Sequence, residues 1–424
     1  MSADLIIRGV NLADGQTAVD LIIDDGVIKA IGTDLDAAGQ TIDAPDCLLT
    51  QPFADSHFHM DATLSLGLPR LNQSGTLLEG IQLWGELKPL LTEEAVIGRA
   101  LDYCDMATAR GIQAIRSHVD VCDPNLTGVK ALLQVRELIK DRITLQLVAF
   151  PQDGLYRYPG ARDLLLQALD MGVDMVGGIP HFERTMDDGA RSVRDLCEIA
   201  KERGLMVDMH CDETDDPHSR HIETLAFETT RLDLGGRVAG SHLTSMHSMD
   251  NYYVSKLIPL IHEAGVAAIA NPLINIQIQG RHDTYPKRRG LTRIKELQEA
   301  GITVAFGHDC VMDPWYSMGS GDMLEVASMA IHCSQLTSRA QMLQCFKAVT
   351  EEPAKIMGLN AGIAVGKPAN FVILDAADAI EAIRLRATRL YCVREGKVIA
   401  KTPKVATQLN VTGRPNEIDL RHRH

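Results

Sequence analysis

The chain has 424 residues, of which 45% are hydrophobic and 23% are charged, and its formal net charge is −14. This composition is ordinary for a globular protein long enough for one barrel and an accessory domain. The acidic balance argues against nucleic acid as a partner, because contacts with phosphates require a basic surface. No stretch approaches the ~20 uninterrupted apolar residues of a membrane span, so we expect no membrane partner.

The nine cysteines include no C-x-x-C pair and no dense cluster. An odd number of scattered cysteines is typical of reduced thiols rather than of a disulfide framework. The first residues place Asp4 before any long apolar stretch and lack a basic start, unlike a secretory signal. We therefore expect a cytoplasmic protein.

Both ends of the chain are rich in short apolar stretches that predict strands, and the turn Asp24-Asp25-Gly26 predicts a hairpin. The expected strands are residues 5–7, 21–23, 27–31, 371–374 and 398–399. The economical interpretation is one small β domain, made by residues 1–50 together with 360–424, with residues 51–359 inserted into it. The charged tail at 421–424 is expected to be frayed.

The inserted segment alternates short apolar strands with amphipathic helices. The expected strands are residues 48–53, 114–116, 145–150, 175–178, 206–209, 238–240, 267–270 and 303–306, and expected helices include 161–171, 193–203 and 293–300. Eight strands that alternate with helices over ~300 residues predict an α/β fold, the (β/α)₈ or TIM barrel.

His57 and His59 follow the first predicted barrel strand. Side chains alternate along extended backbone, so these two imidazoles point the same way while Phe58 points the other way. Two neighbouring imidazoles make half of a metal site. Alone, the pair is weak evidence, because a His-x-His sequence is more often a coincidence.

Polar residues of the same kind follow three further predicted strands: His210 after the fifth, His242 after the sixth and Asp309 after the eighth. A barrel carries its chemistry at the carboxyl ends of its strands, so these side chains should meet. Residues of metal-binding type are unlikely to follow four strands by chance, so this pattern favours a metal site over a coincidental His-x-His pair.

We expect His57, His59, His210 and Asp309 to bind one divalent metal ion, with a position left for water. Three imidazoles and one carboxylate suit Zn²⁺ and Fe²⁺ equally. The metal lowers the pKa of its bound water toward ~7, which makes hydroxide available. His242 would orient or polarise that water, and Glu213 would carry a proton to and from the substrate.

Several similar residues have less specific interpretations. His118 and His181 also lie near strand ends, and we favour supporting or structural roles for both over metal binding. His308 should point away from Asp309 and orient a neighbour. Cys211 is expected to be a packing residue, and the basic run 287–289 a solvated surface.

These residues together resemble the amidohydrolase superfamily, as do the segments 350–359 and 362–370. The resemblance implies a (β/α)₈ barrel with a composite β-sandwich domain made by both chain ends. Many members with two metals carry a carboxylated lysine at the end of strand four. Here that position reads Ile179-Pro180-His181, so the resemblance implies a single metal ion.

Over nearly the whole chain the resemblance narrows to the bacterial cytosine deaminase family. It is carried by residues 72–77, 148–152, 210–213, 283–290 and 313–316. It implies that Gln152 reads the pyrimidine O2 and the neighbouring ring N–H, a task that suits an amide with one donor and one acceptor group. The backbone of Leu77 would contact a ring nitrogen, and Trp315 would form a wall of the pocket.

The resemblance also implies a mechanism in which metal-bound hydroxide attacks C4 of the ring and ammonia leaves. Asp309 would take the water proton, Glu213 would protonate N3, and His242 would stabilise the attacking oxygen. The H-x-E and P-C-x-x-C pattern of cytidine-type deaminases is absent from the sequence.

Cys310 departs from the family pattern, which usually places a second Asp directly after the metal-binding Asp. Cysteine is smaller and less polar than aspartate and accepts apolar contact. Our hypothesis is that Cys310 opens space beside C5 of the ring, so that 5-methylcytosine becomes a substrate. The alternative is a tolerated change that leaves cytosine preferred.

We therefore expect an enzyme, a metal-dependent aminohydrolase that converts 5-methylcytosine to thymine, cytosine to uracil, or both. 5-Fluorocytosine is a plausible surrogate substrate. The first alternative is a deaminase of isoguanine, creatinine or a triazine on the same scaffold, and the second is a catalytically silent base-binding protein. We also expect a homo-oligomer, and the sequence leaves open whether residues 283–290 form a lid.

Overall fold

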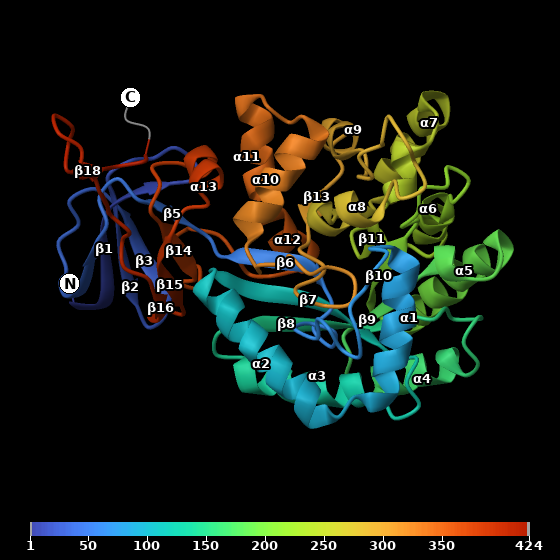
Figure 1. Ribbon diagram of the computed structural model, residues 1–424. Helices are drawn as coiled ribbons and strands as arrows, with labels where there is room; N and C mark the ends of the chain where they lie inside the picture. The colour runs from blue at the N-terminus through green and yellow to red at the C-terminus, as the bar shows by residue number, and fades with distance from the viewer. Residues whose placement is uncertain (1, 422–424) are drawn as a thin grey trace.

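The computed structural model describes residues 2–421, which form two large β-sheets, one of them surrounded by helices (Figure 1). Both termini lie on the side of the smaller domain in Figure 1. Residues 422–424 of the tail that we expected to be frayed lie outside the described residues. Within the described part of the chain, no helix is both long and apolar enough to cross a membrane.

The larger sheet is the predicted (β/α)₈ barrel, which is confirmed. Its eight strands follow chain order and each neighbouring pair is parallel. They are β6 (Phe53–Phe58), β7 (Ile112–Asp120), β8 (Thr144–Phe150), β9 (Met175–Gly178), β10 (Met206–Cys211), β11 (Val238–His242), β12 (Ala267–Ala270) and β13 (Val304–Phe306). Because all carboxyl ends of parallel strands lie at one end of a barrel, the residues that follow them converge.

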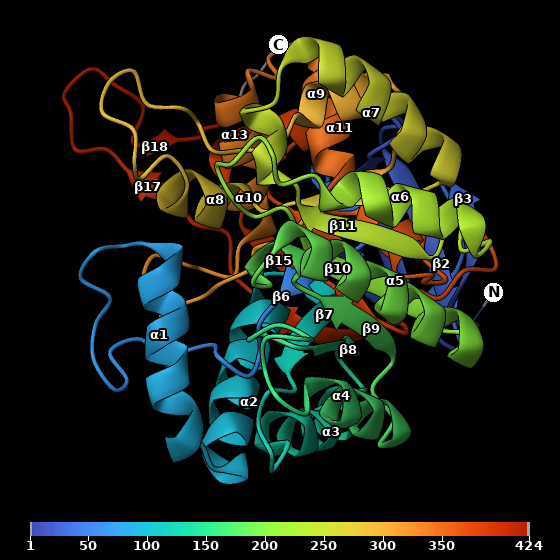
Figure 2. The same cartoon turned by 90° about the vertical axis from the view of Figure 1, so that its right-hand side faces the viewer.

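Helices surround these strands (Figure 2). They are α1 (Leu77–Leu87), α2 (Glu93–Ala109), α3 (Thr127–Ile139), α4 (Ala161–Asp170), α5 (Met186–Arg203), α6 (His221–Arg231), α7 (Asn251–Ala264), α8 (Pro272–Ile278), α9 (Ile294–Glu299), α10 (Met323–Ser334), α11 (Arg339–Lys347) and α12 (Glu351–Ile356). A further helix, α13 (Ala379–Leu385), belongs to the later part of the chain and contacts α10 and α11. The predicted helix 193–203 begins seven residues earlier, because the Thr185 side chain caps α5 by accepting the N–H of Asp188.

The first predicted barrel strand, residues 48–53, is wrong. Leu48–Thr50 forms β5 of the smaller sheet, and the barrel strand β6 begins at Phe53. Pro52 has no N–H to donate and separates the two ladders. Hydrophobicity did not separate them, because Leu48, Leu49 and Phe53 are all fully buried in their respective sheets.

The smaller sheet joins both ends of the chain, with β5 paired to β1 on one side and to β14 on the other. Its strands are β1 (Ser2–Leu12), β2 (Val19–Asp24), β3 (Val27–Gly32), β4 (Ala38–Asp43), β5 (Leu48–Thr50), β14 (Phe371–Leu374), β15 (Arg389–Arg394) and β16 (Lys397–Lys401). Side chains from both chain ends share one apolar core, for example Ile7, Leu21 and Phe371. The domain limits at residues 50 and 360 stay a prediction.

The predicted hairpin turn is present between β2 and β3. Asp25 and Gly26 both have positive φ, 51° and 68°. Two successive left-handed residues match the right-handed twist of the strands, which explains a glycine at the second position. A second small hairpin follows the sheet, formed by β17 (Thr407–Gln408) and β18 (Glu417–Ile418).

Candidate functional site

The barrel closes at the first candidate ligands. The N–H of Asp309 donates to the carbonyl of His57 at 2.8 Å, and the N–H of His59 donates to the carbonyl of Asp309 at 3.1 Å. These two hydrogen bonds join the end of β6 to the residues after β13, and Phe58 and Asp309 form a parallel bridge. The backbone itself therefore holds the His-x-His pair beside Asp309.

Alternation along β6 directs both histidines inward, as predicted. Phe58 stacks on Tyr103 with ring centroids 4.2 Å apart. His57 and His59 instead face His210, with centroid distances of 4.5 and 5.0 Å. The two imidazoles thus lie on the same side of the strand.

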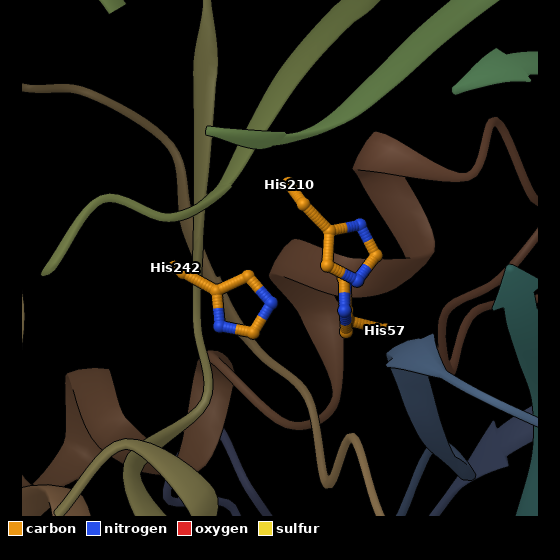
Figure 3. A group of neighbouring side chains, drawn as sticks. All are labelled: His57, His210 and His242. Atoms are coloured by element: carbon orange, nitrogen blue, oxygen red, sulfur yellow. The ribbon is translucent and has the colours of Figure 1, made fainter. Parts of the chain in front are cut away.

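His210 and His242 come from adjacent strands, β10 and β11. The register pairs His210 with Ser241, so His210 and His242 lie one residue out of step, and their rings are 4.9 Å apart. Figure 3 shows the imidazoles of His57, His210 and His242 gathered at one point. His242 and Asp309 both have left-handed backbone, with φ of 71° and 69°, which is uncommon for residues with a Cβ.

Several of the predicted ligand atoms lie about as far apart as the ligands of one metal ion. His59 Nε2 lies 2.9 Å from His210 Nε2, and Asp309 Oδ1 lies 3.4 Å from His59 Nε2 and 3.6 Å from His57 Nε2. A tetrahedral ion with bonds of about 2.1 Å holds its ligand atoms roughly 3.4 Å apart. His242 Nε2 lies 3.8 Å from the second carboxylate oxygen, and a ring nitrogen of His242 lies within 4.8 Å of ring nitrogens of His57 and His210, so His242 belongs to the same cluster.

The protonation states also fit a cation. Burial lowers the pKa of His59 to about 3 and holds the pKa values of His57, His210 and His242 well below their usual range, so the four imidazoles are neutral. The pKa of Asp309 is raised by burial and by a neighbouring carboxyl group, and a divalent ion would relieve that penalty. His57 Nε2 has no hydrogen-bond partner within the described chain.

A chain of hydrogen bonds beneath the site orients His57. Its Nδ1 lies 2.9 Å from Ser241 Oγ, which donates to Asp208 Oδ1 at 2.7 Å. Arg116 donates to the other oxygen of Asp208 at 3.0 Å. Because Ser241 gives its proton to the carboxylate, it accepts one from Nδ1, which leaves the lone pair of His57 on Nε2 for the metal.

Glu213 lies beside His242 rather than among the ligands. Its Oε1 is 3.1 Å from His242 Nδ1 and accepts the side-chain N–H of Asn275 at 3.2 Å. Burial raises the pKa of this carboxyl to about 8. An acid with that pKa can hold a proton at neutral pH and give it to a bound molecule.

One narrow cavity joins the metal cluster to the predicted substrate residues. It is lined by His59, Leu77, Gln152, Ile179, His210, Glu213, His242, Ile274, Ile278, Asp309, Cys310 and Trp315. Every residue for which the family resemblance suggested a substrate contact is in this set. The cavity is apolar on the side of the isoleucines and polar on the side of the metal cluster, which suits a flat ring with polar edges.

Cys310 and Trp315 form one wall of the cavity. Burial and the carboxylate of Asp309 raise the pKa of the Cys310 thiol well above its usual range, so the group is a neutral thiol. Trp315 lies against the indole of Trp84, with ring centroids 6.1 Å apart, and against Gly80 of α1. The Trp84 indole donates to Asp120 at 2.8 Å, which fixes the position of the Trp84 ring.

The structure also places the histidines that we set aside. His118 lies inside β7 rather than after it, fully buried, with its ring 4.3 Å from that of His57. His181 is partly buried in the short turn after β9, and its two ring nitrogens are shielded from solvent without a hydrogen-bond partner within the described residues. His308 Nδ1 lies 3.0 Å from the carbonyl oxygen of Cys310, and its Nε2 accepts the N–H of Gly321. His308 therefore holds the loop that carries Cys310 and Trp315.

Sequence reasoning missed the residues that support the site. Asn271 and Asn275 donate toward the His242 ring, at 3.3 and 3.1 Å. Asn271 directly follows strand β12, so the rule that found the ligands would have found it too. Asp208 and Ser241 lie inside strands, and their meeting depends on the register between β10 and β11, which no sequence pattern displays.

A parallel barrel that gathers three neutral imidazoles and a carboxylate at the carboxyl ends of its strands defines a metal-dependent hydrolase. A model of the amidohydrolase family matches residues 40–400, and the chain belongs to this family. It is accordingly an enzyme that hydrolyses C–N bonds, and its cluster of histidines and Asp309 is able to hold a divalent metal ion.

Three similar proteins cover most of the chain. The 5-methylcytosine deaminase of Klebsiella pneumoniae, crystallised with 5-fluorocytosine, is 42% identical at a TM-score of 0.92, over 94% of this chain and 98% of that chain. The N-isopropylammelide isopropyl amidohydrolase of Pseudomonas sp. (strain ADP) is 28% identical over 94% of this chain and 97% of its own. The pterin deaminase of Rhizobium rhizogenes is 29% identical, over 92% and 90%.

Proposed function

We propose that the protein deaminates a free pyrimidine base with release of ammonia, converting 5-methylcytosine to thymine, cytosine to uracil, or both. The observation that carries the proposal is the single cavity in which Gln152, Cys310 and Trp315 face the His/Asp cluster. The likeness to a 5-methylcytosine deaminase at 42% identity supports the same class of substrate.

The substrate ring would lie between Trp315 and the apolar wall formed by Ile274 and Ile278. Gln152 would bind the O2 edge, because its amide offers both an acceptor for a ring N–H and a donor for a carbonyl oxygen. The backbone of Leu77 would contact a ring nitrogen. These contacts orient the exocyclic amine toward the cluster, and an oriented substrate reacts without a further entropic cost.

We propose that His57, His59, His210 and Asp309 hold one ion, Zn²⁺ or Fe²⁺. When bound, the ion activates a water molecule for attack on C4 of the ring. Asp309 accepts the proton that this water loses, and Glu213, protonated at neutral pH, gives a proton to N3 as C4 becomes tetrahedral. His242 donates a hydrogen bond to the attacking oxygen. Asp309 then passes its proton to the exocyclic nitrogen, and the hydroxyl proton that remains at C4 returns to Glu213 as ammonia leaves.

We propose that Cys310 sets the preference at C5. Its thiol is buried and neutral, within 3.5 Å of Asp309 Oδ1, and it occupies the place where the family usually has a carboxylate. A small neutral side chain there leaves space for a 5-methyl group. A single methyl group changes the free energy of transition-state binding by only ~1–3 kcal/mol. We therefore expect 5-methylcytosine to be preferred while cytosine is still accepted.

A small-molecule substrate and a reducing compartment are consistent with the rest of the molecule. All nine cysteines are free and buried, and none is paired in a disulfide. We accordingly place the reaction in the cytoplasm, and we expect a homo-oligomer.

Ammonia release from a panel of bases tests the proposal. Purified protein is analysed for metal, loaded with Zn²⁺ or Fe²⁺, and assayed with 5-methylcytosine, cytosine, 5-fluorocytosine, isoguanine, creatinine and a triazine. We expect kcat/KM to be highest for the pyrimidines. A preference for isoguanine, creatinine or the triazine would replace the proposal with the first alternative, and no release from any base would indicate a base-binding protein.

A further inference from the structure

A second cavity lies at the opposite end of the barrel from the metal cluster. It has a volume of about 260 Å³ and is lined by residues where four strands begin: Met206, Val238, Ala267 and, just before β13, Thr303. Helix α12 covers it through Lys355 and Ile356. The cavity therefore opens at the amino ends of the strands, and it shares no lining residue with the substrate cavity.

This cavity is lined by positive charge in an acidic protein. Arg116, Arg237 and Lys355 line it together with His262, and no Asp or Glu is among its lining residues. Within residues 2–421, neither Arg237 nor Lys355 forms an ion pair with a carboxylate. Lys355 Nζ instead donates to Thr303 Oγ1 at 3.0 Å, which holds the ammonium against the lining. In a protein with a net charge of −14, two cations without a carboxylate partner in one cavity are unusual.

Of the three cations that line the cavity, only Arg116 is paired with a carboxylate within the described chain, that of Asp208 at 3.0 Å. The carbonyl groups at the C-terminal end of α7, which would oppose an anion, already accept backbone hydrogen bonds, from Gly265 to His262 and from Val266 to Ile261. Uncompensated cations in a concave, partly apolar site attract anions more strongly than the same charges on an open surface.

Arg116, the most deeply buried of these cations, is connected to the metal cluster by a series of hydrogen bonds. Arg116 is fully buried, and it is hydrogen-bonded to Gln146, Asp208 and the carbonyl of Ile356. Asp208 in turn accepts from Ser241, which orients His57. An anion that shares the charge of Arg116 would weaken its hold on Asp208, and the change would pass through two hydrogen bonds to His57.

We propose that this cavity is a binding site for a phosphate group, free or carried on a small organic molecule, and that its occupancy changes how firmly the metal is held. Arg237 and Lys355 would contact the oxygens, since guanidinium and ammonium groups form short, charge-assisted hydrogen bonds with phosphate. The apolar strand starts, such as Val238 and Ala267, would contact any organic part.

Calorimetric titration of the metal-loaded protein tests the site, with inorganic phosphate in one arm and ribose 5-phosphate in the other. We expect saturable binding, and tighter binding of the ester if the apolar lining is used. The double variant Arg237→Gln/Lys355→Gln should lose at least tenfold in affinity. A matched control, Arg203→Gln/Lys347→Gln, removes the same charge from exposed ion pairs outside the cavity and should bind normally.

The link to the metal is measured separately, as the rate at which a coloured chelator removes the ion with and without saturating phosphate. We expect the rate to change severalfold in the wild type and not in the double variant. Equal affinity in the wild type and the double variant, or no saturable binding to the wild type, overturns the site. Binding that leaves the rate of metal loss unchanged overturns the link to His57. Neither readout requires that the enzyme act on a pyrimidine.

Discussion

Glu213 has two neighbours that explain its proposed chemistry, His242 at 3.1 Å and Asn275 at 3.2 Å. Glu213→Gln keeps the size of the side chain and its contact with Asn275 but removes the transferable proton. We expect turnover to fall by about 10²–10⁴, with metal content and thermal stability unchanged. Steady-state kinetics with metal analysis measures this.

The control for that variant is Glu198→Gln, which changes an exposed carboxylate paired with Arg231 on the surface. Exposed pairs contribute little to stability, so the control should match the wild type in every measurement. Normal turnover in Glu213→Gln would show that another group delivers the proton.

Cys310→Asp tests the proposed specificity. An added carboxylate beside Asp309 would occupy the space for a 5-methyl group and should lower kcat/KM for 5-methylcytosine relative to cytosine by about 10–200-fold. Cys310→Ser, which is similar in size and uncharged, should keep the wild-type ratio. If the Asp variant handles both bases as the wild type does, the space beside C5 is not set by this residue.

At the level of single residues, the strand-end rule predicted the grouping of His57, His59, His210 and Asp309, since convergence of carboxyl ends follows from parallel pairing alone. The groups beneath them could not be predicted. Ser241 reaches His57 only because the register of β10 and β11 places Ser241 opposite His210. Register depends on long-range packing, which a single sequence does not display.

Among the elements, α1 determines where Trp315 lies. A Cβ added at Gly80 would come within 2.2 Å of the Trp315 ring, closer than any side chain tolerates. Gly80→Ala should therefore displace the indole and raise KM for the base by tenfold or more, while kcat changes less. Kinetics and the intrinsic tryptophan fluorescence report the two effects.

Gly85→Ala is a matched control in the same helix, because a Cβ there would meet nothing within 4 Å. Alanine is the better helix former by about 1 kcal/mol, so this variant should be as active as the wild type and slightly more stable. Equal KM values for the two alanine variants would show that Trp315 is not confined by α1.

The sequence predicted most elements but misplaced the one next to the site. Residues 48–53 begin and end with buried apolar side chains, and the polar Thr50 and Gln51 between them are buried too, so the pattern merged β5 with the start of β6. Pro52 was the residue that indicated the boundary between the two strands. It has no backbone N–H, so it cannot donate the hydrogen bond that would continue one strand ladder through this position. The local residue pattern predicted that strands form here. Which sheet each strand joins depended on its pairing partners, and for β5 one partner, β14, lies far along the chain.

For the whole molecule, the metal ion should act as a stabilising ligand. The Nε2 atom of His57, which faces Asp309, is buried and has no hydrogen-bond partner within the described residues, so a bound cation would compensate for its desolvation. Removal by a chelator should abolish activity and lower Tm, since a ligand at 100 times its Kd stabilises a fold by about 2.7 kcal/mol.

Scanning calorimetry of the chelated protein, before and after Zn²⁺ or Fe²⁺ is returned, measures the effect of metal removal. We expect Tm and ammonia release to recover together. Mg²⁺, which prefers oxygen ligands, is the control ion and should restore neither. An unchanged Tm after complete removal of the metal would show that the ion does not stabilise the fold.

The position of β5 between β1 and β14 has a consequence for how the protein is made. β5 leaves the ribosome early, but Phe371 of its partner β14 follows about 320 residues later. At roughly 5–20 residues per second, that delay is about 15–65 s. During it the nascent N-terminal strands expose an open, apolar edge that can pair with other chains. Synthesis of this enzyme should therefore depend on chaperones until its last strands appear, however stable the finished barrel is.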